Sequence, residues 1–232
     1  MGHGIDAFLL KLSVMLVPAL LAIILHEVAH GYVADRLGDP TARLLGRLTL
    51  NPLRHLDPIG TIAIFVFGFG WARPVPVNAK NLRHPRQDMI WVALAGPLTN
   101  LALALISVLF LRGISLLETT QLVSSQMFLD ISRPLRVMAA FSLYINLLLG
   151  VFNLLPIPPL DGGRVLVGIL PGKQALWLNR FEPFGFVLLL LLIFFTDVWS
   201  RLLSPLMTLL LQTLAGGEYH YVEKAISFLF GG

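Results

Sequence analysis

Cysteine is absent from the 232 residues of this chain. Its absence excludes a disulfide framework, a zinc site built from thiolates and a cysteine nucleophile. Charged residues are also scarce: they make up 13% of the chain, whereas about 25% is usual in soluble domains. Apolar residues account for 56%, and the mean hydropathy is +0.79. A soluble protein of this length would have to expose large apolar patches, so we expect an integral membrane protein in contact with the lipid bilayer.

The chain has a small excess of positive charge, with 17 Lys and Arg against 13 Asp and Glu. The basic residues lie in short loops between apolar runs and not on a basic helix, so we expect no nucleic-acid partner. Eight of them fall between residues 36 and 86, which predicts that this stretch is cytoplasmic. They are Arg36, Arg43, Arg47, Arg54, Arg73, Lys80, Arg83 and Arg86.

Three apolar runs are long enough to cross a bilayer, which takes about 20 residues. They cover residues 7–33, 89–111 and 137–155, and the polar stretch 115–136 between the last two is expected to be a linker with at most one short helix. A further apolar run begins at residue 184, and the sequence leaves open whether it spans. We predict an α-helical multi-span bundle forming one membrane-embedded domain over 1–232, with its core at about 7–170 and a C-terminal apolar segment at 184–214.

Residues 59–71 are apolar but too short and too rich in glycine for a spanning helix. The proline-rich residues 73–78 follow directly. Alternation and β-branched residues favour strands or a re-entrant loop over 59–78. Such backbone is tolerated at membrane depth where protein or a water-filled cavity covers it.

His26, Glu27 and His30 form the pattern His-Glu-x-x-His near the end of the first apolar run. Residues four apart share one face of an α-helix, so both imidazoles can bind one zinc ion. Glu27 lies one position further round, where it can act as a general base without binding the metal. Three ionisable groups at this depth are costly in a membrane. The alternative is a helix end at the membrane surface, where these side chains meet lipid headgroups.

A catalytic zinc ion usually has a third protein ligand, which must come from elsewhere in the chain. Candidates are His55, Asp57, His84 and Asp161. The first three lie in polar loops where water can solvate them. Asp161 instead follows a proline-broken apolar run and precedes two glycines, and a carboxylate in that place favours a metal ligand. The alternative for Asp161 is an N-cap of the next helix.

Two asparagines lie within apolar runs, Asn100 in the second and Asn153 near the end of the third. Lipid cannot satisfy a buried amide. Each is therefore either a hydrogen-bonding link between helices or a donor to the scissile carbonyl of a substrate.

Three motifs together resemble the signatures of the site-2 protease family of intramembrane zinc metalloproteases. They are His-Glu-x-x-His at 26–30, Gly-Pro-x-x-Asn at 96–100 and Asn-Leu-Leu-Pro-Ile-Pro-Pro-Leu-Asp-Gly-Gly at 153–163. The resemblance implies a three-helix catalytic core, one zinc ion on His26, His30 and Asp161, and Glu27 as the base. It also implies substrate or transition-state contacts from Asn100 and Asn153. No PDZ or CBS domain is recognisable, so the chain resembles a short form of the family.

The same resemblance implies a zinc metalloendopeptidase that cleaves transmembrane helices of membrane proteins in regulated proteolysis. It also implies that the 59–78 stretch corresponds to the family's membrane-associated β segment, which binds substrate as an added strand. The expected location is a prokaryotic cell membrane, with the active site toward the cytoplasm. A rival hypothesis from the residues alone is a metal transporter or metal sensor that uses the same site, and a second rival is a catalytically silent scaffold. Glu27 argues against the transporter, which needs no carboxylate beside the first histidine that does not bind the metal. The intact His-Glu-x-x-His motif argues against the scaffold.

Overall fold

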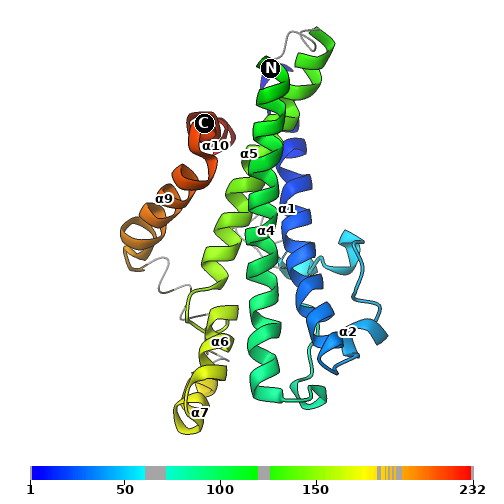
Figure 1. Cartoon of the computed structure of the whole chain (residues 1–232), viewed down its shortest axis with the longest axis vertical. Helices are drawn as coiled ribbons and strands as arrows, with labels where there is room; N and C mark the ends of the chain where they lie inside the picture. Colours follow the sequence, from blue (N-terminus) through cyan, green and yellow to red (C-terminus); the bar gives the residue numbers. More distant parts are fainter. Residues whose placement is uncertain are drawn as a thin grey trace. The chain divides into compact units, whose positions relative to one another are not determined.

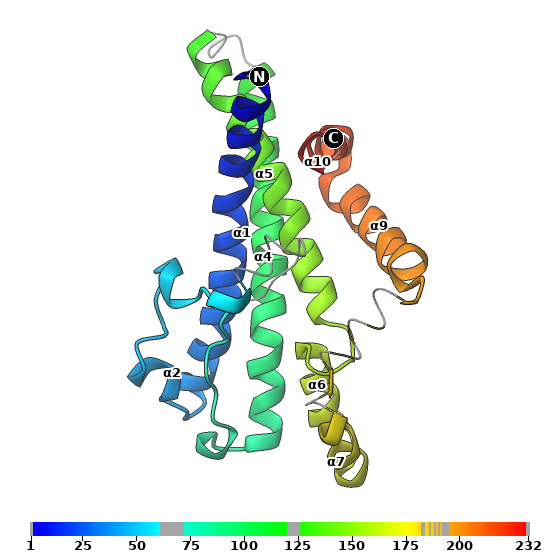
Figure 2. The same ribbon diagram turned by 180° about the vertical axis from the view of Figure 1, so that it is seen from behind.

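A computed structural model gives the fold of the chain (Figure 1; Figure 2). It describes residues 2–60, 72–119, 126–181 and 195–230, together with residues 184, 185, 187, 189 and 191. Most of the predicted β segment at 59–78 and much of the apolar run that begins at 184 therefore lie outside the described residues.

Three long helices dominate the structure: α1 (Gly2–Arg36), α4 (Pro85–Thr119) and α5 (Gln126–Asn153). Each contains a stretch that is long and apolar enough to cross a membrane, and these stretches are Leu9–Arg36, Pro85–Glu118 and Gln126–Asn153. The predicted α-helical membrane fold with three spans is thus confirmed. The expected linker at 115–136 is wrong in its extent, because α4 continues to Thr119 and α5 already begins at Gln126.

The remaining elements are short and connect or follow the spans. Between α1 and α4 lie α2 (Thr41–Leu44) and the 3₁₀ turns η1 (Pro52–Arg54) and η2 (Ala79–Asn81). After α5 come α6 (Asp161–Ile169), α7 (Gly172–Phe181), the π-helical η5 (Trp199–Leu203), α9 (Ser204–Ala215), η6 (Gly216–Glu218) and α10 (Tyr219–Phe230).

The chain divides into two compact units, each made of several chain segments. The first unit combines Met1–Ala22, Asn100–Leu149 and Val198–Gly232. Its apolar core includes Val14 from α1, Phe141 from α5 and Leu229 from α10. Arg136 on α5 binds Glu118 on α4 at 2.6 Å and Glu218 at 3.1 Å. These ion pairs give the charged side chains of Glu118 and Arg136 a partner within the unit. The helices α4 and α5 can therefore extend into the polar stretch 115–136.

The second unit combines Ile23–Thr99 and Gly150–Asp197. A buried carboxylate, Asp39, holds together the chain on either side of α2. It accepts hydrogen bonds from the backbone N–H of Asn78 at 2.6 Å, the side chain of Asn81 at 2.8 Å and the backbone N–H of Thr41 at 3.1 Å. Burial raises the pKa of Asp39, but these hydrogen bonds lower it more, so its pKa lies below the usual value. The carboxylate therefore stays ionised and holds the extended chain that precedes α4.

The start of α6 packs directly against the irregular chain that follows α5. A Cβ atom on Gly162 would clash with the carbonyl oxygens of Leu154 and Leu155. A Cβ on Gly163 would lie 2.5 Å from the backbone nitrogen of Pro158. The two glycines therefore let α6 begin as close to the end of α5 as backbone atoms allow, and this contact fixes the position of Asp161.

We expect Gly162→Ala to destabilise the protein by about 1–3 kcal/mol, because the added methyl group must displace backbone. The measurement is the free energy of unfolding in mixed detergent micelles. Gly172→Ala is the matched control, since a Cβ on Gly172 meets nothing within 4 Å. Equal stability of the two variants would contradict the close packing of α6.

Candidate metal centre

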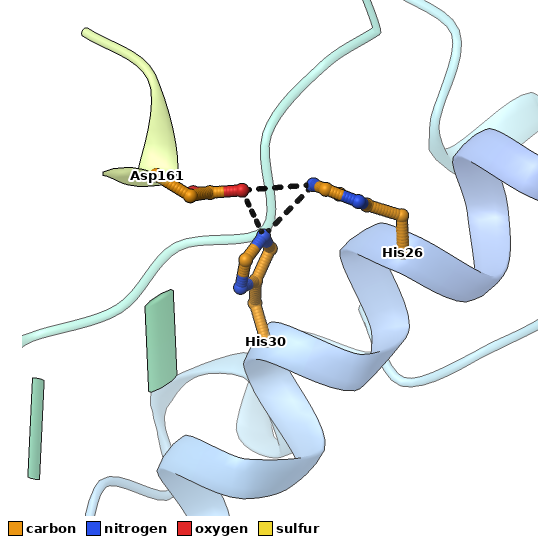
Figure 3. A group of neighbouring side chains, drawn as sticks. All are labelled: His26, His30 and Asp161. Atoms are coloured by element: carbon orange, nitrogen blue, oxygen red, sulfur yellow. Dashed lines mark hydrogen bonds and ion pairs between the residues drawn. The ribbon is translucent and has the colours of Figure 1, made fainter. Parts of the chain in front are cut away.

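His26 and His30 lie one helical turn apart on α1 and direct their imidazoles to the same point (Figure 3). Each side chain is about nine-tenths buried. Their Nε2 atoms are 3.0 Å apart, and the ring planes are close to perpendicular at 86°. The helix therefore presents two nitrogen donors at one site, as the spacing of four residues predicts.

Asp161 is the third member of this cluster and comes from the first residue of α6. Its Oδ2 atom lies 3.1 Å from Nε2 of His26 and 3.2 Å from Nε2 of His30. The N-cap of α6 is Leu160, so Asp161 does not serve as the cap. Oδ2 of Asp161 is buried and makes no hydrogen bond with any of the described residues.

The tautomer of His30 is fixed by a backbone contact. Its Nδ1–H donates a hydrogen bond of 2.7 Å to the carbonyl of Val92 on α4. The proton therefore resides on Nδ1, and Nε2 presents a lone pair to the centre of the cluster. A hydrogen bond from the far ring nitrogen to a backbone carbonyl is the usual way in which a protein orients a metal-binding imidazole.

Gly96 on α4 gives the two imidazoles their space. A Cβ atom at this position would lie 2.5 Å from Nε2 of His30 and 2.6 Å from Nε2 of His26. Any larger residue would thus occupy the position of the donor atoms. In the sequence, Gly96 was marked only as the first residue of the Gly-Pro-x-x-Asn motif at 96–100. Its contact with the histidines was missed.

The cluster opens into a cavity of about 1070 Å³. Glu27 lines this cavity beside His26 and His30, and Asn153 lines it from the end of α5. The carboxylate of Glu27 accepts a hydrogen bond of 2.8 Å from the backbone N–H of Val75. Glu27 therefore faces the same space as the histidines without belonging to the group of three donors.

The other three candidate ligands do not belong to this cluster. His55 is buried and its Nε2 lies 2.8 Å from the carbonyl of Thr49. Asp57 accepts a hydrogen bond from the N–H of Gly60, and His84 is exposed in the turn before α4. Among the described residues, the one group of three or more His, Asp or Glu side chains able to hold a metal ion is His26, His30 and Asp161.

Asn100 is fully buried in the first unit and takes part in a hydrogen-bond network between helices. Its Nδ2 donates to the carbonyl of Ala22 at 3.1 Å and to Oδ1 of Asn146 at 2.9 Å. Asn146 in turn donates to the carbonyl of Ser142 at 2.9 Å. Asn100 thus makes the contacts expected of a link between α1, α4 and α5, whereas Asn153 borders the cavity.

The three donors fit a zinc ion. A tetrahedral zinc ion with bonds of about 2.0–2.1 Å holds neighbouring donors roughly 3.3 Å apart, and the three donor–donor distances here are 3.0, 3.1 and 3.2 Å. Two imidazole nitrogens with one carboxylate oxygen form a ligand set that zinc accepts. A cation bound to all three atoms would also satisfy the buried Oδ2 of Asp161, which lacks a hydrogen-bond donor.

Comparison with known proteins agrees with this geometry. Residues 14–195 match peptidase family M50. The chain is 41% identical over 193 residues to "Putative zinc metalloprotease YwhC" of Bacillus subtilis (strain 168), covering 83% of this chain and 85% of that protein. It is 34% identical over 179 residues to "Putative zinc metalloprotease Rip2" of Mycobacterium tuberculosis (strain ATCC 25618 / H37Rv), covering 75% of this chain and 63% of that protein.

A third relative is archaeal. The chain is 29% identical over 164 residues to "Zinc metalloprotease MJ0392" of Methanocaldococcus jannaschii, covering 70% of this chain and 36% of that protein. No solved structure matches the chain. The family match covers most of the chain and includes all three residues of the cluster, and the three apolar helices place the chain in a membrane. The chain therefore belongs to peptidase family M50, the site-2 protease family, and is a membrane zinc metalloprotease.

Proposed function

We propose that this protease cleaves peptide bonds in or near transmembrane helices of other membrane proteins, as in regulated intramembrane proteolysis. The observation that carries the proposal is that the cluster of three donors lies on and beside membrane-spanning helices. His26 and His30 are within the span Leu9–Arg36. A peptide bond must therefore reach the membrane-embedded part of the protein to be cut.

His26, His30 and Asp161 would hold the zinc ion, and Glu27 would be the general base. Bound zinc supplies a Lewis acid that polarises a carbonyl and makes water more acidic. A carboxylate oxygen of Glu27 takes the proton of the attacking water and then delivers it to the nitrogen of the departing amine. Glu27 suits this role because it lines the cavity beside both histidines and has no place among the three donors.

The carbonyl of the substrate needs a hydrogen-bond donor at the cavity, and Asn153 is our candidate because its side chain borders that space. Asn100 remains a predicted substrate contact from the family resemblance. Its amide hydrogens already bind Ala22 and Asn146, so a contact with substrate would have to exchange one of these bonds. A substrate helix must also unwind, because its carbonyls are hydrogen-bonded within the helix, and glycine or proline in the substrate lowers that cost.

We propose that the site opens toward the cytoplasm of a prokaryotic cell. The basic residues between α1 and α4 favour a cytoplasmic location for this connection. His30 precedes Arg36, the last residue of the first span, by less than two helical turns. The metal transporter or metal sensor that the sequence left open loses support, because family M50 is a peptidase family.

We expect Glu27→Gln to lower the cleavage rate at least about 100-fold, since glutamine cannot accept the proton. Zinc content should stay equal to that of the wild type, because Glu27 is not one of the three donors. The measurement is cleavage of a single-pass helical substrate in liposomes, with zinc determined in both proteins. Cleavage at the wild-type rate by the variant would rule out Glu27 as the base.

We expect Gly96→Ala to weaken zinc binding about tenfold or more, because the methyl group would overlap the imidazole nitrogens. The measurement is competition for zinc with a chelator of known affinity. Gly113→Ala in the same helix is the matched control, since a Cβ on Gly113 meets nothing within 4 Å. An unchanged zinc affinity in Gly96→Ala would show that the histidines do not hold the metal in this geometry.

A further inference from the structure

Glu27 has a hydrogen-bond partner that the cleavage mechanism leaves unexplained. Its Oε2 atom accepts a hydrogen bond of 2.8 Å from the backbone N–H of Val75. Among the described residues, Val75 is the one hydrogen-bond donor that the Glu27 carboxylate has. A carboxylate on a flexible side chain samples several orientations, and a single fixed donor selects one of them.

Val75 has a backbone N–H group, which its two neighbours in the sequence lack. Pro74 and Pro76 flank it, and proline carries no backbone N–H. Val75 is therefore the only backbone donor among residues 74–76, and the structure directs it at Glu27. A residue that precedes proline is also restricted to extended conformations, so Pro76 limits the directions in which the N–H of Val75 can point.

The chain around Val75 is held on both sides. Arg47, which is buried, donates a hydrogen bond of 2.8 Å to the carbonyl of Arg73. The N–H of Arg73 donates to the carbonyl of His55, also at 2.8 Å. Beyond Val75, the N–H of Asn78 donates to Asp39. These contacts fix residues 73–78, which we call the 73–78 segment.

The side chain of Val75 adds a packing contact next to the same face of α1. A Cβ atom on Gly31 would lie 2.7 Å from Cγ1 of Val75. Gly31 follows Glu27 by four residues, so the two lie on one helical face. The 73–78 segment thus rests against the helix that carries Glu27, and its one central N–H meets the carboxylate.

We propose that the backbone N–H of Val75 is a positioning group for the Glu27 carboxylate, and that Arg47 keeps this group in place through Arg73. The inference rests on the proposed role of Glu27 as the base and adds the contact that orients it. One oxygen is held by Val75, and the other is left to face the cavity and accept the proton.

The kinetic test uses the full-length, zinc-loaded protein in liposomes with a single-pass helical substrate. Val75→Pro removes the N–H in a segment that already contains two prolines, and Val75→Ala keeps the N–H but removes most of the side chain. We expect Val75→Pro to lower kcat about 10- to 100-fold, as the loss of one hydrogen bond to a charged group implies, with KM within about twofold. Val75→Ala should lower kcat less than Val75→Pro does, because it keeps the N–H and loses only the side-chain contact with Gly31. Both variants should bind zinc like the wild type.

A second measurement does not depend on cleavage or on the folding of Val75→Pro. Hydrogen–deuterium exchange of a peptide fragment covering residues 73–76 reports on Val75 alone, since Pro74 and Pro76 contribute no amide hydrogen and the N-terminal residue of a fragment loses its label. We expect slow exchange at Val75 in the wild type and in Glu27→Gln, whose amide oxygen can still accept the bond. In Glu27→Ala, exchange should be at least about tenfold faster, because the acceptor is gone.

The outcomes separate this inference from the proposed function. Wild-type kcat in Val75→Pro, or equal exchange in all three forms, overturns the positioning role and leaves the protease mechanism intact. A raised KM with unchanged kcat in Val75→Pro also overturns it, since the segment would then bind substrate and not orient the base. If the wild type cleaves no test helix, the proposed function fails together with the kinetic half of the inference. The exchange experiment then still decides whether Glu27 holds Val75.

Discussion

Three electron-pair donors face one another at 3.0, 3.1 and 3.2 Å in the buried centre of this protease. Without a cation such an arrangement is unfavourable, because the buried Oδ2 of Asp161 has no hydrogen-bond donor to replace the water it has lost. A zinc ion would bind all three donors and remove this cost. The requirement that three donor atoms meet at one point shapes the surrounding structure. That structure brings the three atoms together and keeps other atoms out of the space between them.

Close approach of backbone is the means by which the fold meets this constraint. Gly96 removes a side chain where the imidazoles lie, and Gly162 removes one where α6 meets the chain after α5. Val92 contributes no side chain to the cluster, yet its carbonyl fixes the tautomer of His30. The donors are therefore conspicuous in the sequence, whereas the residues that make room for them are recognised only in three dimensions.

The sequence predicted the three-span fold and the meeting of His26, His30 and Asp161 because these depend on periodicity and on the cost of charge in lipid. Spacing by four places two histidines on one helical face whatever the rest of the chain does. The extent of α4 and α5 could not be predicted in the same way. Glu118 and Arg136 suggested a linker, but they satisfy each other inside the first unit, and an ion pair of this kind depends on partners that are distant in sequence. For the same reason the sequence could not show whether Asn100 binds another residue of the chain or a substrate. Its partner Asn146 lies 46 residues further along the chain.

The placement of Asp161 on α6 has a consequence for the biosynthesis of the protein. The two histidines belong to the first span, but the carboxylate follows His30 by about 130 residues. At a synthesis rate of about 5–20 residues per second, the ribosome reaches Asp161 several seconds or more after the histidines. A partly synthesised chain therefore carries only two of the three donors, and the metal centre is completed only after the third span has been made. A protease assembled in this order has an incomplete metal centre for as long as its own spans are still being synthesised.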